Sequence, residues 1–128
     1  MRRTRTRTRT RKLGFGLYAD EEGLEWVRGL VDEVVGRHAA GTVRIVRTEV
    51  VREYPGSGLT TAELHEMLAE QWAVERPGVD GGAREPVELH VRLECSLRNW
   101  HAVRKGLIAA LCPEGNGPHA CRVPWTAL

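Results

Sequence analysis

The sequence lacks a membrane-spanning segment, a signal peptide and an even set of cysteines, the features that most directly indicate the class of a protein. In its 128 residues no apolar run approaches the roughly 20 residues that a membrane-spanning helix needs. After the basic start Met1-Arg2-Arg3, an Arg/Thr alternation stands where a signal peptide has its apolar segment. The three cysteines are an odd number, which argues for thiols rather than a disulfide framework. These absences predict a cytoplasmic protein without membrane association.

Lysine is also scarce, with only Lys12 and Lys105 among the 19 basic residues, and this Arg-rich composition is typical of a high-GC bacterial genome. Seven of the basic side chains lie within residues 2–12, which hold no acidic residue, so the rest of the chain is net acidic. We expect residues 1–12 to be a disordered basic tail and residues 13–128 to form a single domain. The tail could instead bind nucleic acid or another polyanion weakly. It could also extend the first strand, because threonine favours strands and the alternation has a period of two.

Residues 87–111 carry the clearest structural pattern. Residues 87–97 alternate between apolar and polar side chains, which is typical of a strand with one dry and one wet face. The apolar positions are Val87, Leu89, Val91, Leu93, Cys95 and Leu97, and the polar positions are Glu88, His90, Arg92, Glu94 and Ser96. From Trp100 to Leu111 the apolar spacing changes to that of a helix, which can cover the dry face.

The remaining elements follow from periodicity and from helix-start signals. We expect strands over residues 13–19, 42–54 and 119–125, and helices over residues 20–38 and 60–75. In the second strand the apolar phase breaks once, which predicts a bulge near Val46–Arg47. Thr60 and Glu63 form a capping box at the start of the second helix. The apolar side of that helix consists of Leu64, Met67, Leu68 and Trp72.

The order of these elements, β-α-β-α-β-α-β, predicts an α+β fold. The expected arrangement is a ferredoxin-like, four-stranded, mostly antiparallel sheet (βαβ-α-βαβ) with helices on one face and one inserted helix. A parallel doubly-wound sheet is the alternative. The wet face of the strand at residues 87–97 counts against it, because strands of buried parallel sheets are usually apolar on both faces.

The polar row of this strand is the first candidate site. We name His90, Arg92 and Glu94 as candidate catalytic residues, because a histidine titrates near neutral pH and can act as acid or base. His90 and Glu94 are about 13 Å apart along the strand, so they do not touch directly, and Arg92 between them can pair with a carboxylate. Further candidate binding residues are Glu88 in the same row, Arg47 and Glu49 on the neighbouring strand, and Trp26. The simplest interpretation is a solvated sheet face with cross-strand ion pairs, and a face that packs on a second subunit is a further alternative.

Other candidate sites receive less support from the pattern. Cys112, His119 and Cys121, with His101 as a fourth ligand, form an alternative metal site, but their spacing matches no common zinc motif and we predict no metal. A disulfide between Cys112 and Cys121 is another alternative. Trp26 lies off the apolar stripe of its helix and is a candidate interface anchor. The polar row offers no aromatic platform for stacking bases, which disfavours RNA binding by the sheet.

No motif in the sequence specifies a reaction. The leading hypothesis is a small binding or accessory module, homodimeric, with an unidentified protein or peptide partner and no cofactor. One alternative is a small cofactor-independent enzyme that uses His90, Glu94 and Arg92 in a pocket on the open sheet face. The other is polyanion binding through the Arg/Thr tail.

Overall fold

The computed structural model describes residues 8–112 and 121–128. Its main sheet contains β1 (Arg9–Ala19), β2 (Val43–Val51), β5 (Glu85–Cys95) and β6 (Trp125–Ala127), in the spatial order β2-β5-β1-β6. Every pair of neighbouring strands in this sheet is antiparallel. The predicted α+β class and four-stranded antiparallel sheet are therefore confirmed.

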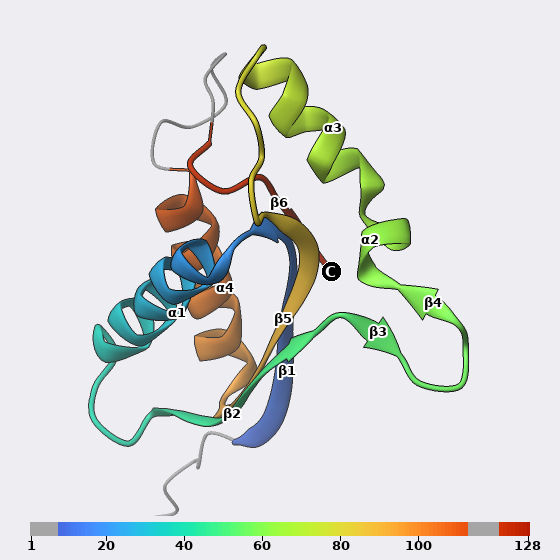
Figure 1. Ribbon diagram of the computed structural model, residues 1–128. Helices are drawn as coiled ribbons and strands as arrows, with labels where there is room; N and C mark the ends of the chain where they lie inside the picture. Colours follow the sequence, from blue (N-terminus) through green and yellow to red (C-terminus); the bar gives the residue numbers. More distant parts are fainter. Residues whose placement is uncertain (1–7, 113–120) are drawn as a thin grey trace, which may run out of the picture.

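Two helices cover one face of the sheet, α1 (Glu21–Gly36) and α4 (Leu97–Leu111), as Figure 1 shows. Asp20 caps α1 by accepting a hydrogen bond from the Gly23 N–H at 2.8 Å, and Ser96 caps α4 in the same way. The apolar stripes of both helices pack on the dry faces of β1 and β5, where side chains such as Leu89 are fully buried. We call the opposite side of the sheet the open face.

A segment between β2 and β5 crosses to the open face. It contains the short hairpin β3 (Glu53–Tyr54) and β4 (Leu59–Thr60), then α2 (Thr61–Leu64) and α3 (Glu66–Glu75). In Figure 1 this segment lies on the side of the sheet away from α1 and α4. The Thr61 hydroxyl connects this segment to β5 by donating a hydrogen bond to the Pro86 carbonyl at 2.8 Å.

The single inserted helix predicted over residues 60–75 is therefore wrong in one respect, because it is two helices. The chain leaves helical geometry at His65, with φ −120° and ψ 31°, and this turn changes which side chains face inward. Leu68 and Trp72 are buried as predicted, but Leu64 and Met67 are exposed. The Thr60 hydroxyl does cap α2, accepting from the Glu63 N–H at 3.2 Å.

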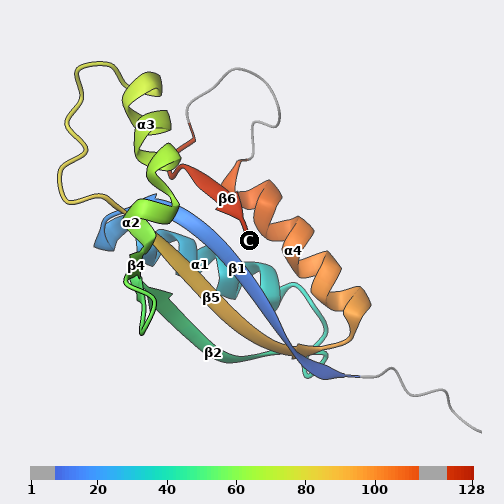
Figure 2. The same cartoon turned by 90° about the vertical axis from the view of Figure 1, so that its right-hand side faces the viewer.

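Strand ends differ from the pattern in several places. β5 ends at Cys95, and Leu97, which was predicted on the dry face, begins α4 and is 52% exposed. β1 begins at Arg9 rather than Leu13, which agrees with the alternative that the Arg/Thr alternation extends the first strand. β6 begins at Trp125, directly after Pro124, whose missing N–H interrupts an earlier start. Figure 2 shows β6 beside β1 at the edge of the sheet. In the described ranges, no helix is both long and apolar enough to cross a bilayer.

The predicted bulge in β2 is confirmed. Ile45 pairs with Leu93, whereas Arg47 pairs with Arg92, so Val46 is the extra residue. A one-residue shift moves every later side chain to the other face of a strand. The bulge therefore places Arg47 on the open face beside Arg92 instead of directing it toward the helices.

Candidate functional site

A buried carboxylate lies on the open face, where the simplest interpretation of the sequence expected solvated residues. Glu88 is only 2% exposed, and His90, two positions along the same strand, is 9% exposed. The solvated-face interpretation is wrong at these two positions, because the inserted segment and β1 close over them. It holds for Arg92 and Glu94, which are exposed.

Three side chains converge on the Glu88 carboxylate. The Tyr54 hydroxyl donates a hydrogen bond to Oε1. His90 Nε2 lies 2.7 Å from the same oxygen, and His65 Nε2 lies 2.7 Å from Oε2. The ligands of this carboxylate therefore come from β3, from β5 itself and from the turn between α2 and α3.

The hydrogen bonds fix the charge of the cluster. Burial on its own would raise the pKa of Glu88, because it removes the charged form from water. Hydrogen bonds from Tyr54, His65 and His90 outweigh burial, so the pKa of Glu88 is lowered overall. The hydrogen bond to Glu88, followed by burial, raises the pKa of Tyr54 to about 12. At neutral pH the cluster thus contains a charged carboxylate and a neutral phenol.

Two glycines of β1 lie beside this cluster, and one of them provides the space for the His65 ring. Gly14 and Gly16 lie opposite His90 and Glu88 in the antiparallel register. A Cβ atom at Gly16 would stand 3.1 Å from both Cε1 and Nδ1 of His65, which is closer than ordinary packing allows. The same Cβ would also stand 2.9 Å from Thr126 Cγ2, so the histidine ring and Thr126 together require glycine at position 16, whereas a Cβ at Gly14 would meet Leu128.

His65 is the member of the cluster that the sequence interpretation missed. The periodicity suggested a continuous helix, in which His65 is an unremarkable polar position. The available signals were the two glycines on the wet face of the first strand and a histidine in the segment that crosses that face. Tyr54 was missed for a similar reason, because it was expected at the end of a long second strand.

Two hollows open beside the cluster. The first, which we call the β2 hollow, has a volume of about 390 Å³ and is lined by residues 49–55 with Lys12, His90 and Arg92. The second, the glycine hollow, has a volume of about 380 Å³ and is lined by Lys12, Gly14, Tyr54, Glu88, His90 and Leu128. Because Lys12, Tyr54 and His90 line both, the two hollows meet around the His90 side chain. Each falls within the size range of small-molecule pockets.

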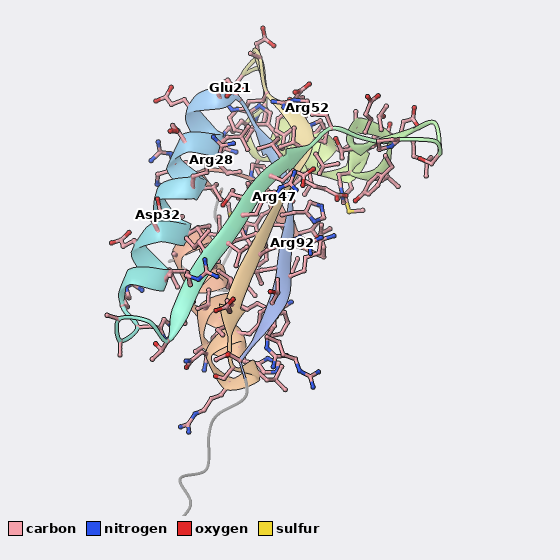
Figure 3. The ribbon with its side chains drawn as sticks, turned by 90° about the horizontal axis from the view of Figure 1, so that it is seen from below. Glu21, Arg28, Asp32, Arg47, Arg52 and Arg92 are labelled. Carbon is pink, nitrogen blue, oxygen red and sulfur yellow. The ribbon has the colours of Figure 1, made fainter. Side chains whose placement is uncertain are left out.

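A row of three cations crosses the sheet, and two of them, Lys12 and Arg92, line the β2 hollow together with the carboxylates Glu49 and Glu53. The register places Lys12 opposite Arg92 on one side and Arg47 opposite Arg92 on the other. Figure 3 shows Arg47 and Arg92 on neighbouring strands. Arg47 pairs with Glu49 at 3.5 Å, but Lys12 and Arg92 have no carboxylate partner among the residues that the structure describes. We call Lys12, Arg92 and Arg47 the cation row.

The other predicted site residues lie elsewhere or have structural partners. Glu94 pairs with Arg44 across β2 and β5, with a distance of 3.0 Å between Arg44 Nη2 and Glu94 Oε2. Trp26 is on α1, on the helix-covered side of the sheet, where the Arg122 guanidinium stacks 4.6 Å from its ring centroid. The structure thus brings His90, Arg92 and Glu49 together at one hollow, with Arg47 adjacent, and separates Trp26 from them.

The three cysteines lie in two places, one in the core and two close together near the end of α4. Cys95 is fully buried in the core, as predicted, and burial raises the pKa of its thiol. The Sγ atoms of Cys112 and Cys121 lie 2.9 Å apart, while His119 lies outside the described residues. In residues 8–112 and 121–128 no group of three or more His, Cys, Asp or Glu side chains is arranged to hold a metal ion. In the buried cluster, both histidine Nε2 atoms are engaged by the Glu88 carboxylate.

Searches against known protein families, curated proteins and solved structures found no significant match to this chain. The chemistry of the open face is therefore the guide to function.

Proposed function

We propose that the protein is a small-molecule-binding module that takes an anionic ligand in the hollows of the open face. The observation that supports this most is the cation row. Like charges directly opposite one another destabilise a sheet, and here three basic residues are aligned across three adjacent strands. An anionic group in the β2 hollow supplies the countercharge that Lys12 and Arg92 lack in the described chain.

The next row of side chains across the sheet, which contains Arg44 and Glu94, differs from the cation row because its charges are opposite in sign. There Arg44 lies opposite Glu94, and the two form an ion pair at 3.0 Å. The chain thus matches opposite charges at one level of the sheet and leaves cations facing one another at the next. The unmatched level is the one that borders the hollows. Arginine favours planar oxyanions, so the ligand class is a small carboxylate or phosphate.

Titration with two simple probes tests this proposal. Inorganic phosphate and succinate are added to the full chain, and binding is followed by calorimetry and by amide shifts in NMR spectra. We expect saturable binding that weakens with added NaCl. Arg92→Gln should lose about 10-fold or more in affinity, since a hydrogen bond to a charged group contributes about 1.5–3 kcal/mol.

Arg44→Gln is the matched control, because it removes an exposed arginine that lies on the same face of the sheet as Arg92 but outside the cation row. Its affinity should equal that of the wild type. Absence of saturable binding by both probes, or an equal loss in R44Q and R92Q, contradicts the proposal.

We also propose that the fold is the ferredoxin-like arrangement. In support, α1 connects β1 and β2, which run parallel on either side of β5, as in a split βαβ unit. α4 connects β5 and β6, which flank β1 in the same manner. The β3–β4 hairpin with α2 and α3 is then an insertion between the two units.

The homodimer stays a proposal as well. β2 is an edge strand, and its bulged residue Val46 is 44% exposed, so this edge is a candidate for pairing with a second copy. Light scattering on the full chain tests it directly. A dimer gives twice the 14.3 kDa mass of the chain, and a mass of 14.3 kDa at all concentrations refutes it.

A further inference from the structure

The buried pair of His90 and Glu88 suggests an activity beyond binding. We propose that His90 is a general base at the meeting point of the two hollows, that Glu88 is its positioning residue, and that the site transfers protons within a bound anionic molecule. This inference rests on the proposed function for its anionic ligand and adds the imidazole as the group that acts on that ligand.

The hydrogen bond to Glu88 determines which imidazole nitrogen carries the proton. Glu88 is charged at neutral pH, so its Oε1 accepts and His90 Nε2, at 2.7 Å, donates. In a neutral imidazole the lone pair is then on Nδ1. His90 Nδ1 is buried, and in the described chain it has no hydrogen-bond partner. Because His90 lines both hollows, a shift of the side chains that cover Nδ1 would let a ligand there provide the donor that this acceptor lacks.

Glu88 is itself fixed, as an orienting group must be. The Tyr54 hydroxyl donates to Oε1 and His65 Nε2 lies 2.7 Å from Oε2, so the carboxylate is held from outside β5 on both oxygens. A nitrogen base held by a buried carboxylate is the arrangement that keeps an imidazole in one tautomer and stabilises the imidazolium. The carboxylate therefore acts through His90 and does not contact the ligand as a base.

His90 rather than His65 is the base, although both contact Glu88. His90 lines both hollows, whereas His65 lines neither of them. The His65 ring packs on β1, where a Cβ at Gly16 would stand 3.1 Å from its Nδ1. His65 is therefore a structural ligand of the carboxylate that also fastens the inserted segment.

The chemical step needs no oxidant or cofactor. A C–H proton next to the carboxylate or carbonyl group of the ligand moves to His90 Nδ1, and the C–H electron pair delocalises into that group. Arg92 lies two residues along β5, about 7 Å from His90, and can hold the resulting negative charge together with Lys12. The imidazolium then returns the proton to the same carbon or to a conjugated one, which gives racemisation or isomerisation.

A neutral carbon acid tests the base without knowledge of the natural substrate. The probe is 5-nitrobenzisoxazole: a base removes its C3 proton, the N–O bond breaks, and the ring opens to one product that carries both a nitrile and a coloured phenolate. We expect the full chain to open it faster than the same concentration of free imidazole. His90→Gln should lower the rate by about 100-fold, within the range that general-base catalysis contributes. His101→Gln, which removes an exposed histidine on α4, is the control and should keep the wild-type rate.

The role of Glu88 has its own readout. Glu88→Gln should lower kcat and leave KM nearly unchanged. The ¹⁵N NMR shifts of His90 should report the Nε2–H tautomer in the wild type and a mixture of tautomers in E88Q. The wild-type spectrum requires no variant, so this measurement remains decisive even if E88Q folds poorly.

Three results overturn the inference: a wild-type rate no higher than that of imidazole, an unchanged rate in H90Q, or a wild-type spectrum that shows the Nδ1–H tautomer. These failures are separate from failure of the proposed function. Phosphate binding without proton transfer refutes the base and leaves anion binding intact. Proton transfer without binding of phosphate or succinate refutes anion binding and leaves the general base intact.

Discussion

Replacement of Glu88 by glutamine tests how the buried cluster contributes to stability. Glutamine has the same shape, and its amide can still be paired if His65 presents the lone pair of Nε2 to it. The variant then keeps three hydrogen bonds but loses the charge that strengthens each of them. A hydrogen bond to a charged group contributes about 1.5–3 kcal/mol, against about 0.5–1.5 kcal/mol for a neutral pair.

The loss of charge assistance in three bonds is thus about 3 kcal/mol, and the relief of burying a charge offsets part of it. We expect E88Q to be destabilised by about 1–3 kcal/mol at pH 7. Glu88→Leu removes the acceptor altogether and leaves three donors without a partner. It should therefore cost more, about 3–5 kcal/mol.

The effect of pH has a definite sign. The pKa of Glu88 is lower in the folded chain than in the unfolded chain, so its charge contributes stability above the unfolded pKa of about 4.3. That contribution is lost as the pH falls through the lower, folded pKa. The difference between wild type and E88Q should therefore be constant between about pH 6 and 8 and shrink steadily below about pH 4.

Urea unfolding followed by tryptophan fluorescence measures these differences, because the chain has four tryptophans. Glu94→Gln is the matched control: it removes an exposed carboxylate from the same strand and should change stability by less than about 1 kcal/mol. Equal stability of E88Q and the wild type at pH 7 would refute a stabilising role for the Glu88 charge. A loss of stability that is the same at about pH 3.5 as at pH 7 would refute it as well.

Two further variants examine the packing around the cluster. Gly16→Ala should cost about 1–3 kcal/mol in urea unfolding, because the new Cβ crowds the His65 ring, whereas Gly29→Ala on α1, where a Cβ meets nothing within 4 Å, should stabilise by up to about 1 kcal/mol. Equal effects at the two glycines would contradict the close approach. Tyr54→Phe should cost about 1 kcal/mol by removing one donor to Glu88, and hydrogen exchange of residues 53–65 should become faster than that of β5. Unchanged exchange in that segment would show that Tyr54 does not hold it.

The regular part of the fold could be predicted from the sequence because it depends on local periodicity. The alternation over residues 87–97 identifies the central strand, and the broken phase at Val46–Arg47 identifies the bulge. Both patterns arise from burial of one face against α1 and α4, which is the dominant stabilising term. The helix start at Asp20 likewise follows from a side chain that satisfies exposed N–H groups. Ser96 and Asn99 were both possible caps of α4, and the structure uses Ser96.

The buried cluster could be predicted only in part, because its contacts are not periodic. His90 was identified from its place in the polar row, and Arg92, Arg47 and Glu49 were named with it. Glu94 was placed in the same candidate site, too far along the strand to touch the histidine, whereas the carboxylate that the structure chooses as the partner of His90 is Glu88. That choice depends on how the inserted segment crosses the sheet, which no spacing in the sequence encodes. Trp26 was named because it lies off an apolar stripe, but Arg122 accounts for its position by stacking on it.

The attachment of the inserted segment to Glu88 has a thermodynamic consequence. Tyr54 and His65 hold the segment on the sheet through the same carboxylate that orients His90. Docking of the segment and alignment of the imidazole are therefore linked equilibria. A ligand that engages His90 must strengthen the docking by the same free energy by which docking strengthens its binding. A partner that pulls residues 53–75 away from the sheet would loosen the Glu88 carboxylate and so weaken the preference of His90 for the Nε2–H tautomer. The segment can therefore carry the effect of a ligand to a partner, or the effect of a partner to the ligand site.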